Sequence, residues 1–117
     1  MQVPIATNQQ KENLALAYGN AATHGALYTT APGTAAGTEP TGGSPAYARR
    51  PLTWAAGTVD GIVTATATFD VPSGATIVGV GLHTALTGGT YLDGATVTSQ
   101  AFASQGTYQV TFTYTQS

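Results

Sequence analysis

The stretch Gly61-Ile-Val-Thr-Ala-Thr-Ala-Thr-Phe-Asp-Val71 alternates strictly between apolar and polar side chains. One face of the extended chain carries Val63, Ala65, Ala67, Phe69 and Val71, and the other carries Thr64, Thr66, Thr68 and Asp70. A period of two residues is typical of a β-strand that turns one face to a core and the other to water. This stretch therefore predicts a long amphipathic strand.

The C-terminal run repeats the pattern. Apolar side chains at Tyr108, Val110, Phe112 and Tyr114 alternate with polar ones at Thr107, Gln109, Thr111, Thr113 and Thr115. Further strands are predicted at 25–30, 46–55, 76–84 and 90–97, with turns at Gly88-Gly89 and Asp93-Gly94. Pro51 marks its segment as an edge strand, since proline cannot donate to a ladder.

Two glycines share one face of the 76–84 strand, Gly79 and Gly81. Their missing side chains predict close approach of a bulky group, either Trp54 or a tyrosine ring. Short strands between glycine-containing turns favour a mostly β fold, a β-sandwich or a jelly-roll-like arrangement. At 117 residues, positions 1–117 fit a single domain.

A short helix is predicted at 8–18. Thr7 and Gln10 have the spacing of a capping box, and Gly19-Asn20 supplies a C-terminal stop. Leu14 and Tyr18 are four residues apart and are expected to share its buried face. The segment 34–45, rich in Gly, Pro and Thr, is predicted to be a long surface loop that touches a partner.

Charge is scarce, and this excludes several classes of function. Only 7% of residues are charged, the net charge is −2, and the fixed cations are Lys11, Arg49 and Arg50. Three cations cannot form the basic stripe of a nucleic-acid-binding protein or a polybasic membrane patch. The sequence contains no cysteine, which excludes disulfides and thiolate metal sites. The N-terminal residues Met1–Ile5 show no signal-peptide pattern, and no apolar stretch approaches the length of a membrane span.

The sequence offers no catalytic or metal-binding constellation. His24 and His83 are the only histidines, and a metal site needs three or four convergent ligands. Asp60 and Asp93 precede glycines as turn residues do, and Asp70 ends a strand. A glycoside hydrolase, the enzyme alternative, needs two carboxylates about 5 Å apart. We therefore expect a protein that is not an enzyme and has no cofactor and no metal.

The candidate partner contacts are Glu39, Tyr47, Arg49, Arg50 and Trp54. Two interpretations of the arginine pair remain open. In the first, both guanidinium groups bind carboxylates of a partner subunit. In the second, the two arginines are neighbours in a strand and point to opposite faces, so one faces solvent and the other pairs with Glu39 or Asp60 within the chain. Trp54 and Tyr47 suit core packing as well as an interface.

Several strings carry a resemblance: Gly42-Gly-Ser-Pro-Ala-Tyr-Ala-Arg-Arg50 with Leu52-Thr-Trp54, Asn8–Lys11, Leu27–Thr30, Phe69–Pro72 and Gly106–Tyr108. Together they resemble a family of short bacteriophage virion proteins, labelled tail-fibre-like or minor tail proteins, with similar small folds among capsid decoration proteins of actinobacterial phages. The resemblance covers nearly the whole chain. It implies a structural virion protein and brings no catalytic residues.

The resemblance implies, first, a capsid decoration (cement) protein on the outer capsid surface, with the major capsid protein as partner. The alternative is a minor tail or tail-fibre component that binds tail proteins and adheres to the host surface. Either is assembled in the host bacterial cytoplasm. A homo-oligomer is expected because low net charge gives little mutual repulsion, and analogy with virion proteins at three-fold positions favours a trimer.

Overall fold

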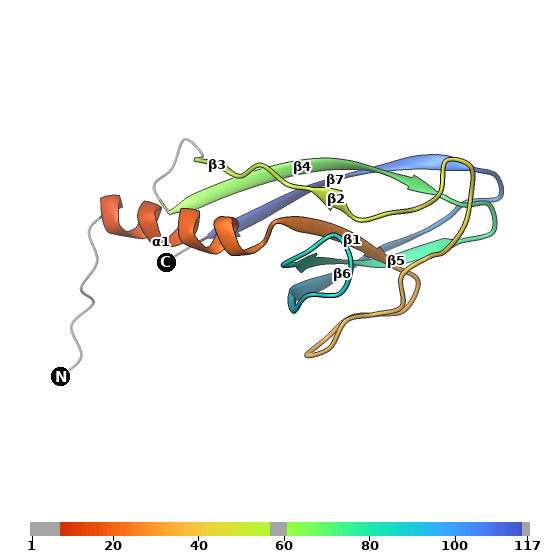
Figure 1. Ribbon diagram of the computed structural model, residues 1–117, viewed down its shortest axis with the longest axis horizontal. Coiled ribbons are helices and arrows are strands. Elements are labelled where there is room, and N and C mark those ends of the chain that lie inside the picture. The colour runs from red at the N-terminus through yellow and green to blue at the C-terminus, as the bar shows by residue number, and fades with distance from the viewer. Residues whose placement is uncertain (1–7, 57–60, 116–117) are drawn as a thin grey trace.

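The structure is a computed structural model that describes residues 8–56 and 61–115 (Figure 1). Helix α1 spans Asn8–Ala21. The strands are β1 (His24–Tyr28), β2 (Arg50–Pro51), β3 (Ala55–Ala56), β4 (Ile62–Val71), β5 (Thr76–His83), β6 (Tyr91–Ala101) and β7 (Gly106–Thr115). Thr7 and Asp60, which the sequence assigns to a helix cap and a turn, lie outside the described residues.

The described strands form two antiparallel sheets, which confirms the mostly β prediction. One sheet has the order β2-β1-β5-β6 and the other the order β3-β4-β7. The chain crosses between them from β4 to β5 and again from β6 to β7, so the long strands of one sheet lie over those of the other (Figure 1). The result is an elongated β-sandwich, with extents of 53 × 26 × 26 Å.

The predicted alternation of β4 and β7 is confirmed. Val63, Phe69 and Val71 are fully buried, whereas Thr66 and Thr68 are exposed. The two strands pair along their whole length, and the hydroxyls of Thr66 and Thr111 lie 3.0 Å apart on the outer face. Leu27, Ile77, Val80 and Leu82 supply the opposite wall of the core.

The helix runs three residues beyond its predicted end, and its buried face differs from the predicted one. Gly19 and Asn20 lie inside α1, so the predicted stop is wrong. Leu14 is 44% exposed, so its predicted burial is wrong, whereas Tyr18 is half-buried against the core and Ala15 and Gly19 are buried. The helix therefore packs through Ala15, Tyr18 and Gly19, and at Gly19 the ring of Trp54 comes too close for a larger side chain.

Glycines allow bulky side chains to pack closely against the outer face of the four-stranded sheet. A Cβ at Gly81 would meet the ring of Tyr28, and one at Gly79 would come within 2.4 Å of Pro32 Cδ. This confirms close approach by a tyrosine at Gly81. Asp93-Gly94 is not a turn as predicted but part of β6, where Gly94 pairs with Gly81. A Cβ at Gly94 would lie 2.5 Å from the hydroxyl oxygen of Tyr91, so the glycine here serves packing.

The segment 34–45 forms no strand, as predicted, and part of it packs on the sandwich. The Thr29 amide donates to the carbonyl of Thr38 at 2.7 Å. Gly37 lies against Thr30 and the ring of Tyr28, and Pro40 is buried. In contrast, Thr34, Ala35 and Ala36 are all exposed. The loop therefore has a packed base and a free tip.

The two flanks of the sandwich differ. One flank carries the two-residue strands β2 and β3, and the chain between them crosses from one sheet to the other in the foreground of Figure 1. Leu52 in this crossing donates its amide to the carbonyl of Thr23. The opposite flank consists of the long strands β6 and β7, each of which pairs on one side only among the described strands.

Candidate functional site

A groove of about 310 Å³ runs between β6 and β7. The residues that line it are Tyr18, Trp54, Val80, Gly81, Leu82, Asp93, Gly94, Ala95, Val97, Val110, Thr111, Phe112, Thr113 and Tyr114. They come from both sheets, from α1 and, at Trp54, from the segment between β2 and β3. The groove follows from the topology: two adjacent sheets end here and, within 8–56 and 61–115, no further element covers the gap.

The hydrophobic core forms the floor of the groove. Val80, Leu82 and Phe112 are buried members of the core cluster and also line the groove. Val97 and Val110 are only half-buried at the same place. A partner that filled the groove would remove this apolar surface from water, a stabilising change of about 25 cal/mol for each Å² buried.

The two strand edges beside the groove carry almost no charge. Asp93 is the single charged residue in β6 and β7 together, and neither strand contains proline. Natural sheets blunt an exposed edge with lysine, proline or very short strands. At 11 and 10 residues, β6 and β7 are long strands without lysine or proline, and β7 is regular, whereas the pairing of β6 with β5 shifts register between Ile77 and Gly79 and between Leu82 and His83. Their edges are therefore suited to pairing with another chain.

Aromatic residues gather at one end of the groove. The rings of Tyr18 and Tyr114 stack with centroids 3.9 Å apart, and Trp54 lies edge-on to Tyr18. The Tyr18 hydroxyl donates to Asp93 Oδ2 at 3.4 Å. Burial and the charge of Asp93 raise the pKa of Tyr18 to about 12. Tyr18 therefore stays protonated near neutral pH and donates to the carboxylate.

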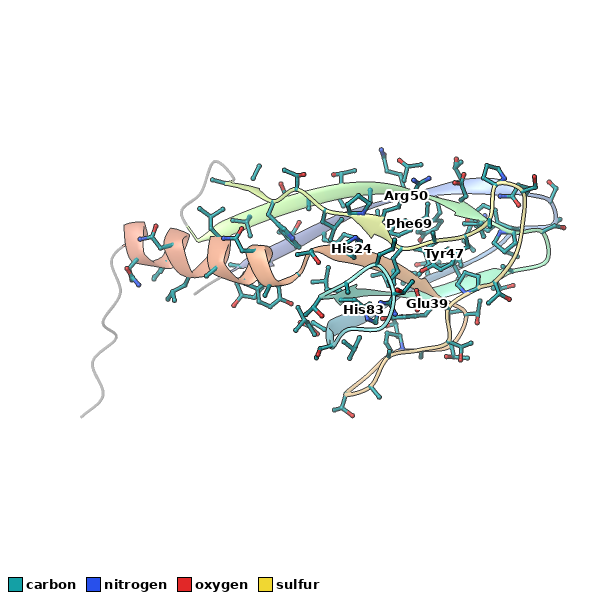
Figure 2. The ribbon with its side chains drawn as sticks, in the orientation of Figure 1. His24, Glu39, Tyr47, Arg50, Phe69 and His83 are labelled. Carbon is teal, nitrogen blue, oxygen red and sulfur yellow. The ribbon has the colours of Figure 1, made fainter. Side chains whose placement is uncertain are left out.

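Three of the predicted contact residues form a network on the other side of the molecule, and Figure 2 shows Glu39 and Tyr47 together. Arg49 donates through Nε to Glu39 Oε1 at 3.0 Å and through Nη2 to Oε2 at 2.9 Å. The Tyr47 hydroxyl donates to Glu39 Oε1 at 2.8 Å and accepts the amide of Leu27 at 3.0 Å. Burial alone would raise the pKa of Glu39, but hydrogen bonds from Arg49 and Tyr47 outweigh it and hold that pKa below its usual value.

The two adjacent arginines, Arg49 and Arg50, have different partners. Arg49 also donates to the carbonyls of Ala85 and Gly88. Arg50 pairs with Asp70 at 2.9 Å, and 45% of its side chain stays exposed. The two guanidinium groups thus have separate intramolecular partners, one of which is Glu39, as the second interpretation expects. A role of these residues at an interface stays a prediction.

The predicted contact residues do not form one site. Glu39, Tyr47 and Arg49 are together, Arg50 lies on β2, and Trp54 lines the groove. Trp54 is anchored there by a 2.8 Å bond from Nε1 to the carbonyl of Ala22. Sequence reasoning missed the groove itself, because it is created by strand order, which the alternating pattern does not encode.

The histidines have separate neighbours. His83 is buried with Nε2 2.5 Å from the hydroxyl of Tyr28, and His24 Nδ1 lies 2.9 Å from Thr23 Oγ1. Burial and nearby Arg49 lower the pKa of His83. In the described part of the chain, no three His, Cys, Asp or Glu residues are grouped to hold a metal ion. No helix there is long and apolar enough to cross a membrane.

Comparison with known proteins gives one family. The family model described as podophage GP4 fiber I protein gp80 matches residues 12–116, nearly the whole chain. No curated protein and no solved structure matches significantly.

Proposed function

Because this chain belongs to the podophage GP4 fiber I protein gp80 family, we propose that it is a building block of a virion fibre. Membership of a phage fibre family makes it a structural component of the virion. We further propose that it has no enzymatic activity and acts by binding other virion chains.

One structural observation supports this proposal more than any other: the long edges of β6 and β7 lie on one flank beside an apolar groove. A monomeric protein gains nothing from two such edges, because unpaired strands of low charge invite association. An assembly protein uses them, since main-chain hydrogen bonds supply affinity and side-chain pockets supply specificity.

The alternative to a fibre component is a capsid decoration protein, which would bind the major capsid protein on the outer shell. A chain that binds only the assembled shell would stabilise that shell by mass action. The groove would serve such a chain equally well, but the family description favours a fibre.

Immunogold electron microscopy of intact particles tests the proposal. Antibody raised against this chain should label the fibres and leave the capsid surface unlabelled. Label confined to the outer capsid would contradict the fibre proposal and favour decoration. Particles that lack the gene product provide the control for antibody specificity.

Adhesion to the host surface is the finer role that a fibre component can have. The aromatic end of the groove is the place where a sugar ring could stack, but Tyr18 and Tyr114 already cover one face of each other. Binding of the purified chain to host cell-wall glycans, with Trp54→Ala as the comparison, tests this role. Equal binding by both proteins would remove the groove as the adhesion site.

A further inference from the structure

We propose that the β6–β7 flank binds the same flank of a second copy of this chain, around a two-fold axis perpendicular to the sheets. Such an axis places β7 beside its equivalent in the partner, and β6 beside its equivalent, with both pairs antiparallel. The three-stranded and four-stranded sheets then each continue into the partner. This deepens the proposed function by naming the partner, and it rests on that function only for its biological setting.

The position of the free edges decides the symmetry. A closed ring of three, joined by strand pairing, needs a free edge on both flanks, because each copy presents different surfaces to its two neighbours. Here the opposite flank holds only the two-residue strands β2 and β3, and β2 contains Pro51. A two-fold contact joins the same flank of both copies, so each copy needs free edges on one flank only. The flank geometry therefore favours a dimer over the trimer expected from analogy.

The chemistry of the flank is self-complementary. On the outer face of β7 the side chains are threonine and glutamine, and on the inner face they are aromatic or aliphatic. An antiparallel pair of identical strands sets polar residues beside polar ones and apolar residues beside apolar ones. The two grooves face each other across the axis, so Val97 and Val110 of each copy become covered by the other.

The single charge does not oppose this contact. Asp93 lies near one end of β6, so pairing two β6 strands about their centres separates the two carboxylates by about 20 Å. That exceeds the Debye length of about 8 Å at physiological ionic strength. Like-charge repulsion across the axis is therefore screened.

The strand edges alone give an interface smaller than the standard size. Strands of 10 and 11 residues give a length of roughly 35 Å, and the two stacked sheets give a thickness of about 10 Å. The product of this length and thickness, about 350 Å² per copy, is a lower bound on the buried area, because side chains above and below the strand edges add to it. A standard interface buries about 800 Å² per partner.

The test uses edge lysines in the full-length chain. Ala95 on β6 and Thr111 on β7 are both exposed, line the groove and lie within about one residue of their strand centres. The double variant Ala95→Lys/Thr111→Lys should keep the far-UV circular dichroism of the wild type but weaken dimerisation about a hundredfold, because pairing about the strand centres places the like charges of the two copies close together. Thr68→Lys, on the same outer face but on the inner strand β4, is the matched control and should leave the dimer intact.

Sedimentation equilibrium gives the mass directly. The wild type should have twice the chain mass of 11.8 kDa, and the double variant should have the single-chain mass at the same concentration. A wild type that stays monomeric to about 1 mM overturns the proposal and leaves the flank to a different virion chain. A double variant that dimerises as tightly as the wild type overturns it too.

Cysteine cross-linking locates the contact. The sequence has no cysteine, so any disulfide comes from the introduced residue. Single cysteines at Thr107, Thr111, Thr113 and Thr115 scan the outer face of β7, and the position nearest the axis should form a disulfide-linked dimer fastest. Thr68→Cys should form none. A dimer in which no β7 position cross-links faster than Thr68→Cys contradicts the proposed flank. These solution results are independent of the virion location, so either proposal can fail without the other.

Discussion

Gly19 and Trp54 are in contact so close that no other residue fits at position 19. A Cβ on Gly19 would lie 2.5 Å from Cγ of the indole ring. The ring cannot move away freely, because its Nε1 donates to the carbonyl of Ala22 at 2.8 Å and its edge packs against Tyr18. This contact joins α1 to the segment between β2 and β3.

Gly19→Ala should therefore destabilise the protein. Alanine gains about 1 kcal/mol of helix propensity over glycine, but overpacking a tight contact costs about 1–3 kcal/mol. We expect a net loss in the free energy of unfolding, measured by urea denaturation. Asn20→Ala, at the exposed neighbouring position, should not lower that free energy by more than about 0.5 kcal/mol. A Gly19→Ala variant as stable as wild type would show that Trp54 is free to move.

The two adjacent arginines should differ sharply when each is replaced by alanine. Arg49→Ala leaves the half-buried Glu39 carboxylate without its main partner and should cost about 2–3 kcal/mol. Arg50→Ala removes a more exposed pair with Asp70 and should cost less than about 1 kcal/mol. Thermal and urea denaturation of the two variants gives the comparison. Equal losses would mean that the Glu39 network does not stabilise the fold.

Stability should fall as the pH is lowered from 7 towards 5, and His83 should be the cause. Burial first, then the charge of Arg49, lower the pKa of His83 from its usual 6.5, although Glu39 acts in the opposite direction. The unfolded chain therefore binds a proton more readily than the folded one below about pH 6.5. The contribution of His83 is complete above that pH and is lost as the pH falls towards its folded pKa.

Urea denaturation at pH 7.5, 6.5 and 5.5 measures this dependence. His83→Gln should remove most of the slope in this range, whatever its effect on overall stability. His24→Gln, at the other histidine, is the comparison variant. Glu39, whose pKa is lowered, adds its own loss of stability only below about pH 4.5. A wild-type slope that persists in His83→Gln would assign the effect elsewhere.

The strands that could be predicted are those whose two faces differ. In β4 the alternation from Val63 to Val71 reports burial directly, since one face meets the core and the other meets water. The C-terminal end of α1 is harder to predict from the sequence, because a glycine such as Gly19 can have either of two structural roles. It stops a helix when its backbone freedom is used, and it permits close packing when its missing side chain is used. Only the position of Trp54 selects the second role.

The same ambiguity explains Asp93-Gly94, which sits inside β6 because Gly94 lies against Tyr91 and the carbonyl oxygen of Val80. The groove could not be predicted for a different reason. Its walls come from β6 and β7, which neighbour each other across the sheets because β5 pairs with β6 and β4 with β7. Pairing of this kind is set by long-range contacts that a single sequence does not display.

The loop at 34–45 should separate into a structural base and a dispensable tip. The base holds Glu39 in its network and joins Thr38 to Thr29 and Thr30 by hydrogen bonds. Deleting residues 34–45 should therefore unfold the domain or cost several kcal/mol, because it leaves Arg49 and Tyr47 without their carboxylate. Replacing Thr34, Ala35 and Ala36 together by serine should change the free energy of unfolding by about 0.5 kcal/mol or less, since all three are exposed.

If the predicted partner contact involves the tip, this triple variant should fold normally and yet incorporate poorly into particles, which quantitative western blotting of purified virions measures. Normal incorporation would exclude the tip as a contact, and a large loss of stability would show that the tip is structural.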